Sequence, residues 1–205
     1  MMRRRLLLKD KLPSTYTRLE YIYNPSSAYI DTGVRRDAYT RCSMDIVLMR
    51  QSAGFLPIFG CRSGWTNASM KALYISDSKF FINYGTFDGS SNIPYTMGTK
   101  CHIELNNNIY TFNGEEYKCT TKISTPITYN CGIGKVIGDG PNSATLKIYS
   151  FKMWDGTEFI RNFIPARSKA DNTVGLYDLV GSKFYSSASG AAFQGSDETL
   201  STSEE

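Results

Sequence analysis

The chain contains one histidine, His102, and acid–base or nucleophilic chemistry would be sought there first. Its neighbour Cys101 is a potential nucleophile. The surrounding residues predict a strand, and consecutive side chains on a strand point to opposite faces. The two groups therefore could not form a nucleophile–base pair or share a metal ion. We predict that His102 is a surface residue or supports a turn.

Other catalytic patterns are missing from the sequence. There is no Gly-x-Ser-x-Gly, no phosphate-binding glycine loop and no zinc-ligand spacing. A retaining glycosidase needs two carboxylates close together, but Asp45 has no acidic neighbour at two-residue spacing and Glu115-Glu116 fall in a predicted turn. Four loop residues could bind calcium but are more typical of turns: Asp88, Asn92, Asp139 and Asn142. We expect a protein that is not an enzyme and carries no cofactor or metal.

Two long polar loops, residues 62–69 and 85–97, hold side chains suited to binding a sugar. An aromatic face can stack on a sugar ring while amides and carboxylates bond its hydroxyls. The candidate glycan-binding residues are Trp65, Asn67, Asp88, Asn92 and Tyr95. In the alternative interpretation, the two aromatic rings cover a sheet edge and the polar residues form turns.

Charge is concentrated at the two ends of the chain. The predicted N-terminal arm, residues 1–14, carries Arg3, Arg4, Arg5, Lys9 and Lys11, and residues 1–12 have a net charge of +4. The remaining residues are net neutral, and the predicted polar tail, residues 197–205, is acidic. A nucleic-acid-binding domain would spread basic residues over one face, so a nucleic-acid partner is not expected. We expect the arm to dock on other proteins of an assembly.

The elements that must position these residues are strands. Residues 143–167 predict a long hairpin that turns at Asp155-Gly156 and ends at Pro165. The apolar phase changes after Ile148, which indicates a bulge or a strand leaving a one-sided surface. Phe151, Phe163 and Ile164 are expected between two sheets.

Turn residues divide the rest of the chain into short strands. Residues 19–22 and 28–32 predict a first strand and its return, residues 100–120 a three-strand meander, and residues 132–137 a further strand. Residues 192–193 predict a closing strand. About a dozen strands without helical periodicity favour an all-β fold: a two-sheet antiparallel sandwich formed by residues 15–196.

The cysteines and the length of the apolar runs indicate the cellular compartment in which the protein is made. The five cysteines are an odd number without Cys-x-x-Cys spacing, which favours buried thiols over a disulfide framework. Residues 3–5 are arginines followed by only three leucines, too short an apolar run for a signal peptide, and no run has the length of a membrane span. We therefore expect that the protein is made in the cytoplasm, is not exported by a cleaved signal peptide and has no membrane partner.

Seven stretches, taken in order and spacing, resemble a known group of proteins. They are residues 19–22, 28–33, 59–62, 146–152, 161–167, 174–178 and 184–185. Together they resemble the concanavalin A-like (laminin-G-like) jelly-roll domains of bacteriophage structural proteins, particularly those of phages that infect gut bacteria. The resemblance covers roughly residues 17–195. It implies two curved antiparallel sheets and a place in the virion, but no catalytic residue, because a shared fold does not transfer an active site.

The sequence leaves three hypotheses for function. The first is a virion protein of a fibre, tail appendage or capsid surface that acts as an interaction module, forms an oligomer or part of a larger assembly, and recognises host surface polysaccharide. The second is a carbohydrate-active enzyme of the same fold. The third is an architectural decoration protein without a ligand.

Overall fold

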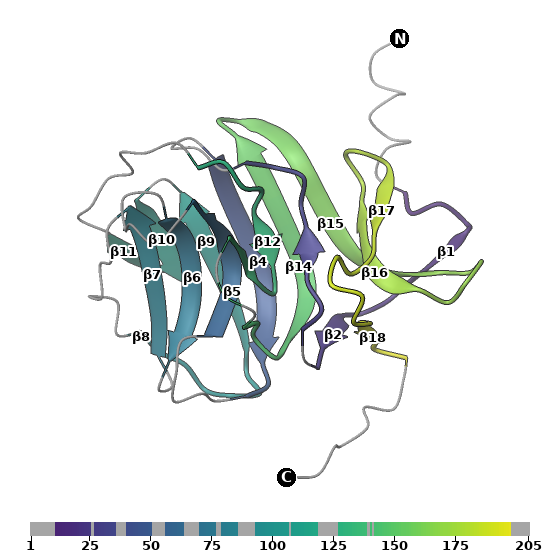
Figure 1. Ribbon diagram of the computed structural model, residues 1–205, viewed down its shortest axis with the longest axis horizontal. Helices are drawn as coiled ribbons and strands as arrows, with labels where there is room; N and C mark the ends of the chain where they lie inside the picture. Colours follow the sequence, from purple (N-terminus) through teal and green to yellow (C-terminus); the bar gives the residue numbers. More distant parts are fainter. Residues whose placement is uncertain are drawn as a thin grey trace.

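Two facing β-sheets form the body of the computed structural model (Figure 1). The structure describes residues 11–25, 27–35, 40–50, 56–63, 70–76, 79–85, 93–106, 108–118, 127–138, 140 and 142–197. All regular elements in these ranges are strands, so the predicted all-β class is confirmed. The described part of the chain contains no helix with the length and apolar character needed to cross a membrane.

The larger sheet is built around the predicted hairpin. Its strand order is β11 (Glu115–Lys118), β10 (Ile109–Phe112), β9 (Lys100–Asn106), β4 (Thr40–Leu48), β14 (Leu146–Asp155), β15 (Glu158–Ser168), β16 (Val174–Asp178) and β17 (Lys183–Tyr185). Three short strands extend it, β1 (Tyr16–Arg18) on β15, β2 (Ile22–Asn24) on β14, and β18 (Gln194–Gly195) on β2. Figure 1 shows the long β14–β15 pair running from the middle of this sheet to the end of the molecule where β1, β16 and β17 lie.

The smaller sheet packs across the first. Its order is β3 (Ile30–Asp31), β12 (Gly132–Ile133), β5 (Leu56–Arg62), β6 (Met70–Ser76), β7 (Lys79–Gly85) and β8 (Ile93–Pro94). One further strand, β13 (Val136–Ile137), runs parallel to β5. The other pairings are antiparallel, and the fold is a two-sheet jelly-roll sandwich.

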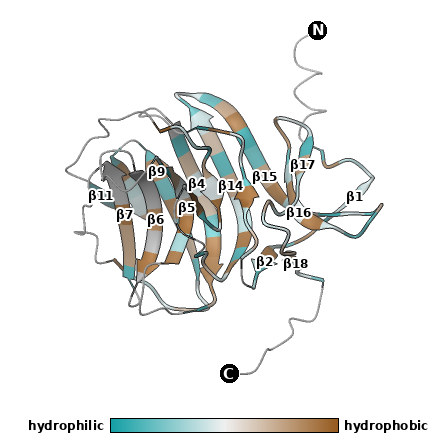
Figure 2. Ribbon diagram, in the orientation of Figure 1, coloured by the Kyte–Doolittle hydropathy of each residue, from teal (hydrophilic) through white to brown (hydrophobic). Residues whose placement is uncertain are grey.

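Strand β4 illustrates how the sequence selects these faces. Cys42, Met44, Ile46 and Leu48 are each 0–1% exposed, and the alternate residue Asp45 lies on the outer face. This alternation places one side of the strand in the core, while the other side is only partly exposed, because Ser43 and Val47 there are also buried, at 6% and 5% exposure. Figure 2 shows the same alternation of hydrophilic and hydrophobic residues along β14 and β15.

The central hairpin is confirmed, with a shift in its turn. Asp155 pairs with Glu158, so the two turn residues are Gly156 and Thr157, where the sequence predicted Asp155 and Gly156. Only Gly156 of these has a positive φ, +55°, which fits a type II′ turn with glycine at its first central position. The predicted change of phase is a bulge, because the register against β4 slips between Ile148 and Ser150.

The prediction that Pro165 ends the second strand is wrong. β15 continues to Ser168, and Pro165 lies where its neighbour changes from β14 to β1. The Pro165 carbonyl accepts a hydrogen bond from the Leu19 backbone N–H at 3.1 Å. Proline is tolerated here because the missing N–H falls in the gap between two partners and interrupts neither ladder.

Ile164 is also not where the sequence placed it. Phe151 and Phe163 are fully buried in the core between the sheets, as predicted. Ile164 points to the opposite face, since it follows Phe163 directly on a strand. There it joins a second apolar cluster with Ala166, Tyr177 and Leu179, which is covered by Leu12, Tyr16 and Phe184.

Several shorter predictions need correction. Residues 19–21 separate β1 from β2, and the returning segment shortens to β3, which lies in the other sheet and pairs with β12. The strand predicted at 132–137 divides into β12 and β13 at Gly134, whose φ is +86°. The closing strand is Gln194–Gly195, two residues later than expected. The 100–120 meander is confirmed as β9, β10 and β11, with a positive φ at Asn113 and Gly114.

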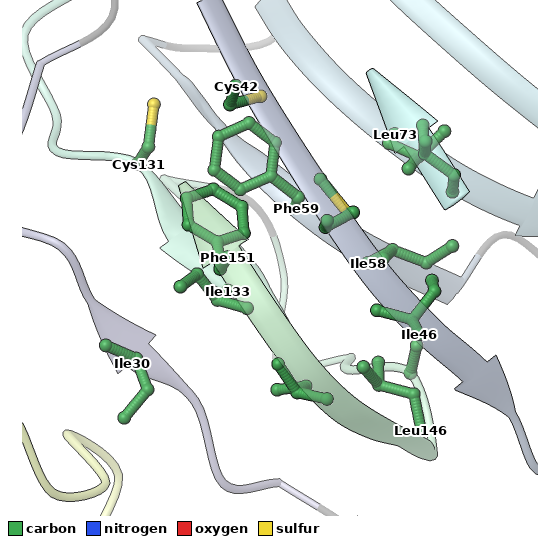
Figure 3. Close-up of a cluster of buried hydrophobic side chains, with 14 of the residues drawn as sticks. Ile30, Cys42, Ile46, Ile58, Phe59, Leu73, Cys131, Ile133, Leu146 and Phe151 are labelled. Atoms are coloured by element: carbon green, nitrogen blue, oxygen red, sulfur yellow. The ribbon is translucent and has the colours of Figure 1, made fainter. Parts of the chain in front are cut away.

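Aromatic rings join the two sheets. Phe59 of β5 contacts Phe151 of β14 with ring centroids 5.0 Å apart, and Phe151 contacts Phe163 at 6.2 Å. Figure 3 shows Phe59 and Phe151 among aliphatic side chains from both sheets. Cys42, Cys61, Cys101 and Cys131 are buried, as predicted, while Cys119 lies outside the described residues.

Candidate functional site

Most of the predicted glycan-binding residues cannot be placed. Trp65, Asn67, Asp88 and Asn92 lie outside the described residues. Tyr95 is described, just after β8, and is half-buried. The structure therefore does not test whether the five predicted residues lie together, and their joint role stays a prediction.

Tyr95 lies at the edge of the core. Its ring contacts Phe80 with centroids 5.1 Å apart and packs against the main hydrophobic cluster. Its hydroxyl is buried without a hydrogen-bond partner, and burial raises the pKa of the phenol above its usual value. The ring thus lies beside β8, the edge strand of the smaller sheet, and covering a sheet edge is the alternative role that the sequence allowed for it.

The described part of the N-terminal arm is anchored to the body. Lys11 is exposed, whereas Leu12 packs on the cluster beneath β1. Arg3, Arg4, Arg5 and Lys9 lie outside the described residues. At the other end, Asp197 bonds Arg167 through both carboxylate oxygens, at 2.7 and 3.2 Å, and this contact holds the pKa of the carboxyl below its usual value. The first residue of the predicted acidic tail thus contacts β15.

A polar network occupies the outer face of the larger sheet. Cross-strand pairing aligns Ser150, Asp45 and His102 from β14, β4 and β9. The Ser150 hydroxyl donates to Asp45 Oδ2 at 2.6 Å, and His102 Nδ1 lies 2.8 Å from Asp45 Oδ1. Desolvation by burial raises the pKa of Asp45. The hydrogen bonds from Ser150 and His102, together with nearby positive charge, outweigh this effect and hold the pKa below its usual value.

This network does not have the geometry of a hydrolase triad. A nucleophilic serine must hydrogen-bond to the imidazole, but the Ser150 hydroxyl bonds to the carboxylate instead. His102 Nε2 faces Glu104 at 3.5 Å, and Glu104 bonds Arg41 at 2.9 Å. Cys101 points the other way, as predicted, with its thiol 3.6 Å from the Ile46 carbonyl oxygen. The arrangement is a chain of ion pairs and hydrogen bonds across adjacent strands.

An aromatic pair borders the same face. Trp154 of β14 and Phe159 of β15 have ring centroids 4.6 Å apart, and the Arg41 guanidinium lies 4.8 Å from the centroid of the Trp154 ring. Phe159 is 41% exposed. Trp154 is therefore held between a ring and a cation, which stabilises its position at the hairpin end.

The described residues also form an open pocket of about 590 Å³ near β16 and β18. Its walls come from the turn between β15 and β16 and from the segment that follows β17. They include Asp171, Thr173, Ser186, Ser187, Ala192, Phe193 and Gln194. We call this site the hydroxyl-lined pocket.

Each wall of the hydroxyl-lined pocket offers a different contact. Phe193 is 4% exposed and supplies an apolar floor, while Thr173, Ser186 and Ser187 supply hydroxyls. The Gln194 Oε1 atom is buried without a hydrogen-bond partner, although buried acceptors are usually satisfied. A volume in this range, with apolar surface and a few fixed polar groups, is typical of small-molecule sites.

Asp171 is the acidic side chain of the pocket, and it is already engaged. Hydrogen bonds from Ser168 and from the Thr173 backbone N–H hold the pKa of its carboxyl below the usual value. The carboxylate therefore stays ionised near neutral pH and is poorly suited to act as a general acid. The described residues contain no group of three or more histidine, cysteine, aspartate or glutamate residues placed to hold a metal ion.

Searches against protein families and against curated proteins find no match for this sequence. Among solved structures, the fold is similar to a Trypanosoma rangeli sialidase in complex with sialic acid, at 11% identity and a TM-score of 0.53. That alignment covers 69% of this chain and 26% of the sialidase, so the chain spans about a quarter of the longer protein. At this identity the likeness shows the sandwich fold alone.

Two weaker similarities involve other sandwich proteins. The enzymatically active domain of bacteriophage CBA120 tailspike protein 2 aligns at 12% identity over 74% of this chain and 31% of its own, with a TM-score of 0.48. A heptameric SAP-like pentraxin from Limulus polyphemus aligns at 13% identity over 67% of this chain and 70% of its own, with a TM-score of 0.40.

Sequence reasoning missed the hydroxyl-lined pocket. Its lining comes from two separate segments, and most of its polar residues are serine, asparagine and aspartate, which usually form turns. By contrast, strand alternation does indicate that Asp45 and His102 face outward. Only the pairing of β4 with β9 shows that they meet.

Proposed function

We propose that this chain is a non-enzymatic structural protein of a bacteriophage virion, with a concanavalin A-like domain that recognises host surface glycan. The observation that carries the proposal is the hydroxyl-lined pocket. Sugars present hydroxyls that both donate and accept hydrogen bonds, together with apolar C–H faces. The Thr173 and Ser186 hydroxyls, the Gln194 amide and the Phe193 ring match these two kinds of surface.

The number of carboxylates in the pocket favours binding of a glycan without its hydrolysis. Glycosidases of the common two-carboxylate type place two carboxyl groups on either side of the scissile bond. Asp171 is the one carboxylate among the described lining residues, and its bonds to Ser168 and Thr173 hold it ionised. A ligand here would be held by hydrogen bonds and stacking.

The test is binding of bacterial capsular and cell-wall polysaccharides, first by array and then by calorimetry. We expect the wild-type chain to bind at least one glycan, and Ala192→Trp to weaken that binding at least tenfold by filling the pocket. Ala192 is exposed and lines the pocket. Ala188→Trp is the matched control, because Ala188 is an exposed alanine four residues earlier that does not line it.

The other outcomes separate the alternatives. If Ala192→Trp binds as wild type does and Trp65→Ala does not, the site is the predicted loop site around Trp65. If the glycan is shortened during incubation, seen as new reducing ends, the chain is an enzyme. If no host glycan binds, the protein is an architectural decoration component.

The basic arm is proposed to join the domain to other virion proteins. Its charges, Arg3, Arg4, Arg5, Lys9 and Lys11, precede the anchored Leu12. Deletion of residues 1–10 should therefore leave the apolar cluster intact and the domain folded, while incorporation into particles is lost. Normal incorporation of the folded, truncated protein would refute this role.

A further inference from the structure

Two buried cysteines lie in contact across the smaller sheet. The Sγ atoms of Cys61 and Cys131 are 3.1 Å apart, and both residues are 0% exposed. Cys61 belongs to β5, and Cys131 immediately precedes β12. Figure 3 shows Cys131 beside the same core cluster as Phe59 and Phe151.

The strand register explains why the sulfurs meet. In the antiparallel β5–β12 pair, Ile133 is opposite Phe59 and Gly132 is opposite Gly60. Extending this register by one residue sets Cys131 beside Cys61, whose parallel-strand partner is Ile137 of β13. The contact is therefore a consequence of sheet pairing, and the two side chains point to the same face of the sheet.

The backbone hydrogen bonds of Cys131 show that it forms a non-hydrogen-bonded cross-strand pair with Cys61. Its N–H donates to the Val34 carbonyl at 2.8 Å, and its carbonyl accepts from the Thr32 N–H at 3.1 Å. Both main-chain groups are thus directed at the segment around β3 and away from Cys61. In antiparallel sheets, such non-hydrogen-bonded pairs have Cα atoms about 4.5 Å apart. That spacing lies inside the range that disulfides require.

We propose that Cys61 and Cys131 are a site of covalent modification, at which an intrachain disulfide forms under oxidising conditions. A disulfide oxidant of the glutathione type supplies the chemistry. One cysteine thiolate attacks oxidised glutathione and releases a first glutathione, and the second thiolate then attacks the mixed disulfide and releases another. The two protein thiols are oxidised, their two protons pass to the two glutathione thiolates that are released, and one oxidised glutathione thus becomes two reduced molecules.

The cross-link would fasten segments that are far apart in the chain. The two cysteines are 70 residues apart in sequence. Closing a loop of this length restricts the unfolded chain, and the local register already matches the bonded geometry. We expect the oxidised protein to melt roughly 5 to 15 °C above the reduced protein.

The test uses the full chain refolded from denaturant in a buffer of reduced and oxidised glutathione, so that burial of the thiols does not limit access. The product is unfolded, alkylated without reduction, and digested for mass spectrometry. We expect a monomer with three alkylated cysteines of the five in the sequence, and a peptide pair joined through Cys61 and Cys131. Reduction before alkylation should restore five labels.

Variants give a second, independent measurement. Cys61→Ala and Cys131→Ala should each keep all four remaining thiols under the same conditions and lose the gain in melting temperature. Cys42→Ala is the matched control, since Cys42 is equally buried but lies on β4, and it should still lose two thiols. Five labels on refolded wild-type protein, or a linked peptide pair containing another cysteine, would overturn the proposal.

Discussion

Replacement of Asp178 tests how a single buried carboxylate holds the end of the hairpin. Asp178 is the last residue of β16 and is 0% exposed. Its Oδ1 atom accepts the backbone N–H of Asn162 at 2.9 Å and of Val180 at 3.1 Å, and Oδ2 accepts that of Gly181 at 3.1 Å. We predict that Asp178→Asn and Asp178→Ala both destabilise the fold, by different amounts.

The two variants differ because the Oδ1 and Oδ2 atoms of Asp178 accept different hydrogen bonds. Asparagine keeps an acceptor for Asn162 and Val180, but its NH₂ group would face the Gly181 N–H and the Arg161 Nε, which lies 3.7 Å from Oδ2. Loss of one bond to a charged acceptor costs about 1.5–3 kcal/mol, whereas alanine leaves three donors unsatisfied and should cost about 4–6 kcal/mol. For a chain of this size these values correspond to melting temperatures lower by roughly 5–10 °C and 10–20 °C.

The assay is thermal unfolding followed by circular dichroism at neutral pH, with Asp155→Ala as control. Asp155 is an exposed carboxylate at the far end of the hairpin and should shift the melting temperature by little. Equal losses in the Asn and Ala variants would show that the charge matters and the three N–H bonds do not. Losses no larger than that of Asp155→Ala would refute the reasoning altogether.

Four further outcomes follow from the same structure. Phe163→Ala should lower the free energy of unfolding by about 3–5 kcal/mol in urea titrations, whereas Phe159→Ala, 41% exposed, should change it little; equal effects would contradict the core assignment. Gly156→Val should lower the melting temperature although its Cβ meets nothing within 4 Å, because a β-branched residue resists the positive φ; an unchanged melt would place the turn elsewhere. The pKa of Asp45 is lower in the folded protein than its ordinary 3.8. The ionised carboxylate therefore contributes to stability above that pH, and this contribution is lost as the pH falls through the folded pKa. Asp45→Asn should lose less stability than wild type on acidification, and parallel losses would exclude a contribution of the carboxylate. Burial and the Asp45 charge raise the pKa of the Cys101 thiol to about 12, so alkylation of native Cys101 near pH 8 should be far slower than after unfolding, and equal rates would contradict its burial.

Local rules predicted the core face of single strands and the turns between neighbouring strands. Alternation set the faces of β4, and the Asn113-Gly114 pair marked a turn of the meander. Register between distant segments was beyond those rules. The position of Pro165 is tolerated only because β1 replaces β14 at that point, and β1 is about 150 residues earlier in the chain.

The candidate site was predicted less well than the fold for a related reason. A pocket arises where two turns happen to face each other, and Thr173 and Ser186 have no local pattern that marks them as neighbours. The contact between Cys61 and Cys131 likewise depends on the pairing of β5 with β12. Odd cysteine number and wide spacing describe a chain without a disulfide framework, but they do not exclude one pair that sheet register brings together.

The pairing of β2 has a consequence for how the protein is made. β2, residues 22–24, pairs with β14, which begins at residue 146, and with β18, at residues 194–195. On the ribosome its partners emerge only after most of the chain has been synthesised, whereas β6–β7 and the β9–β11 meander can pair as soon as they appear. Late closure of long-range pairs slows folding and leaves the core residues of β2, such as Ile22, exposed in the nascent chain. Yield in cells should therefore depend on translation rate and on chaperones that shield the first strands until the hairpin arrives.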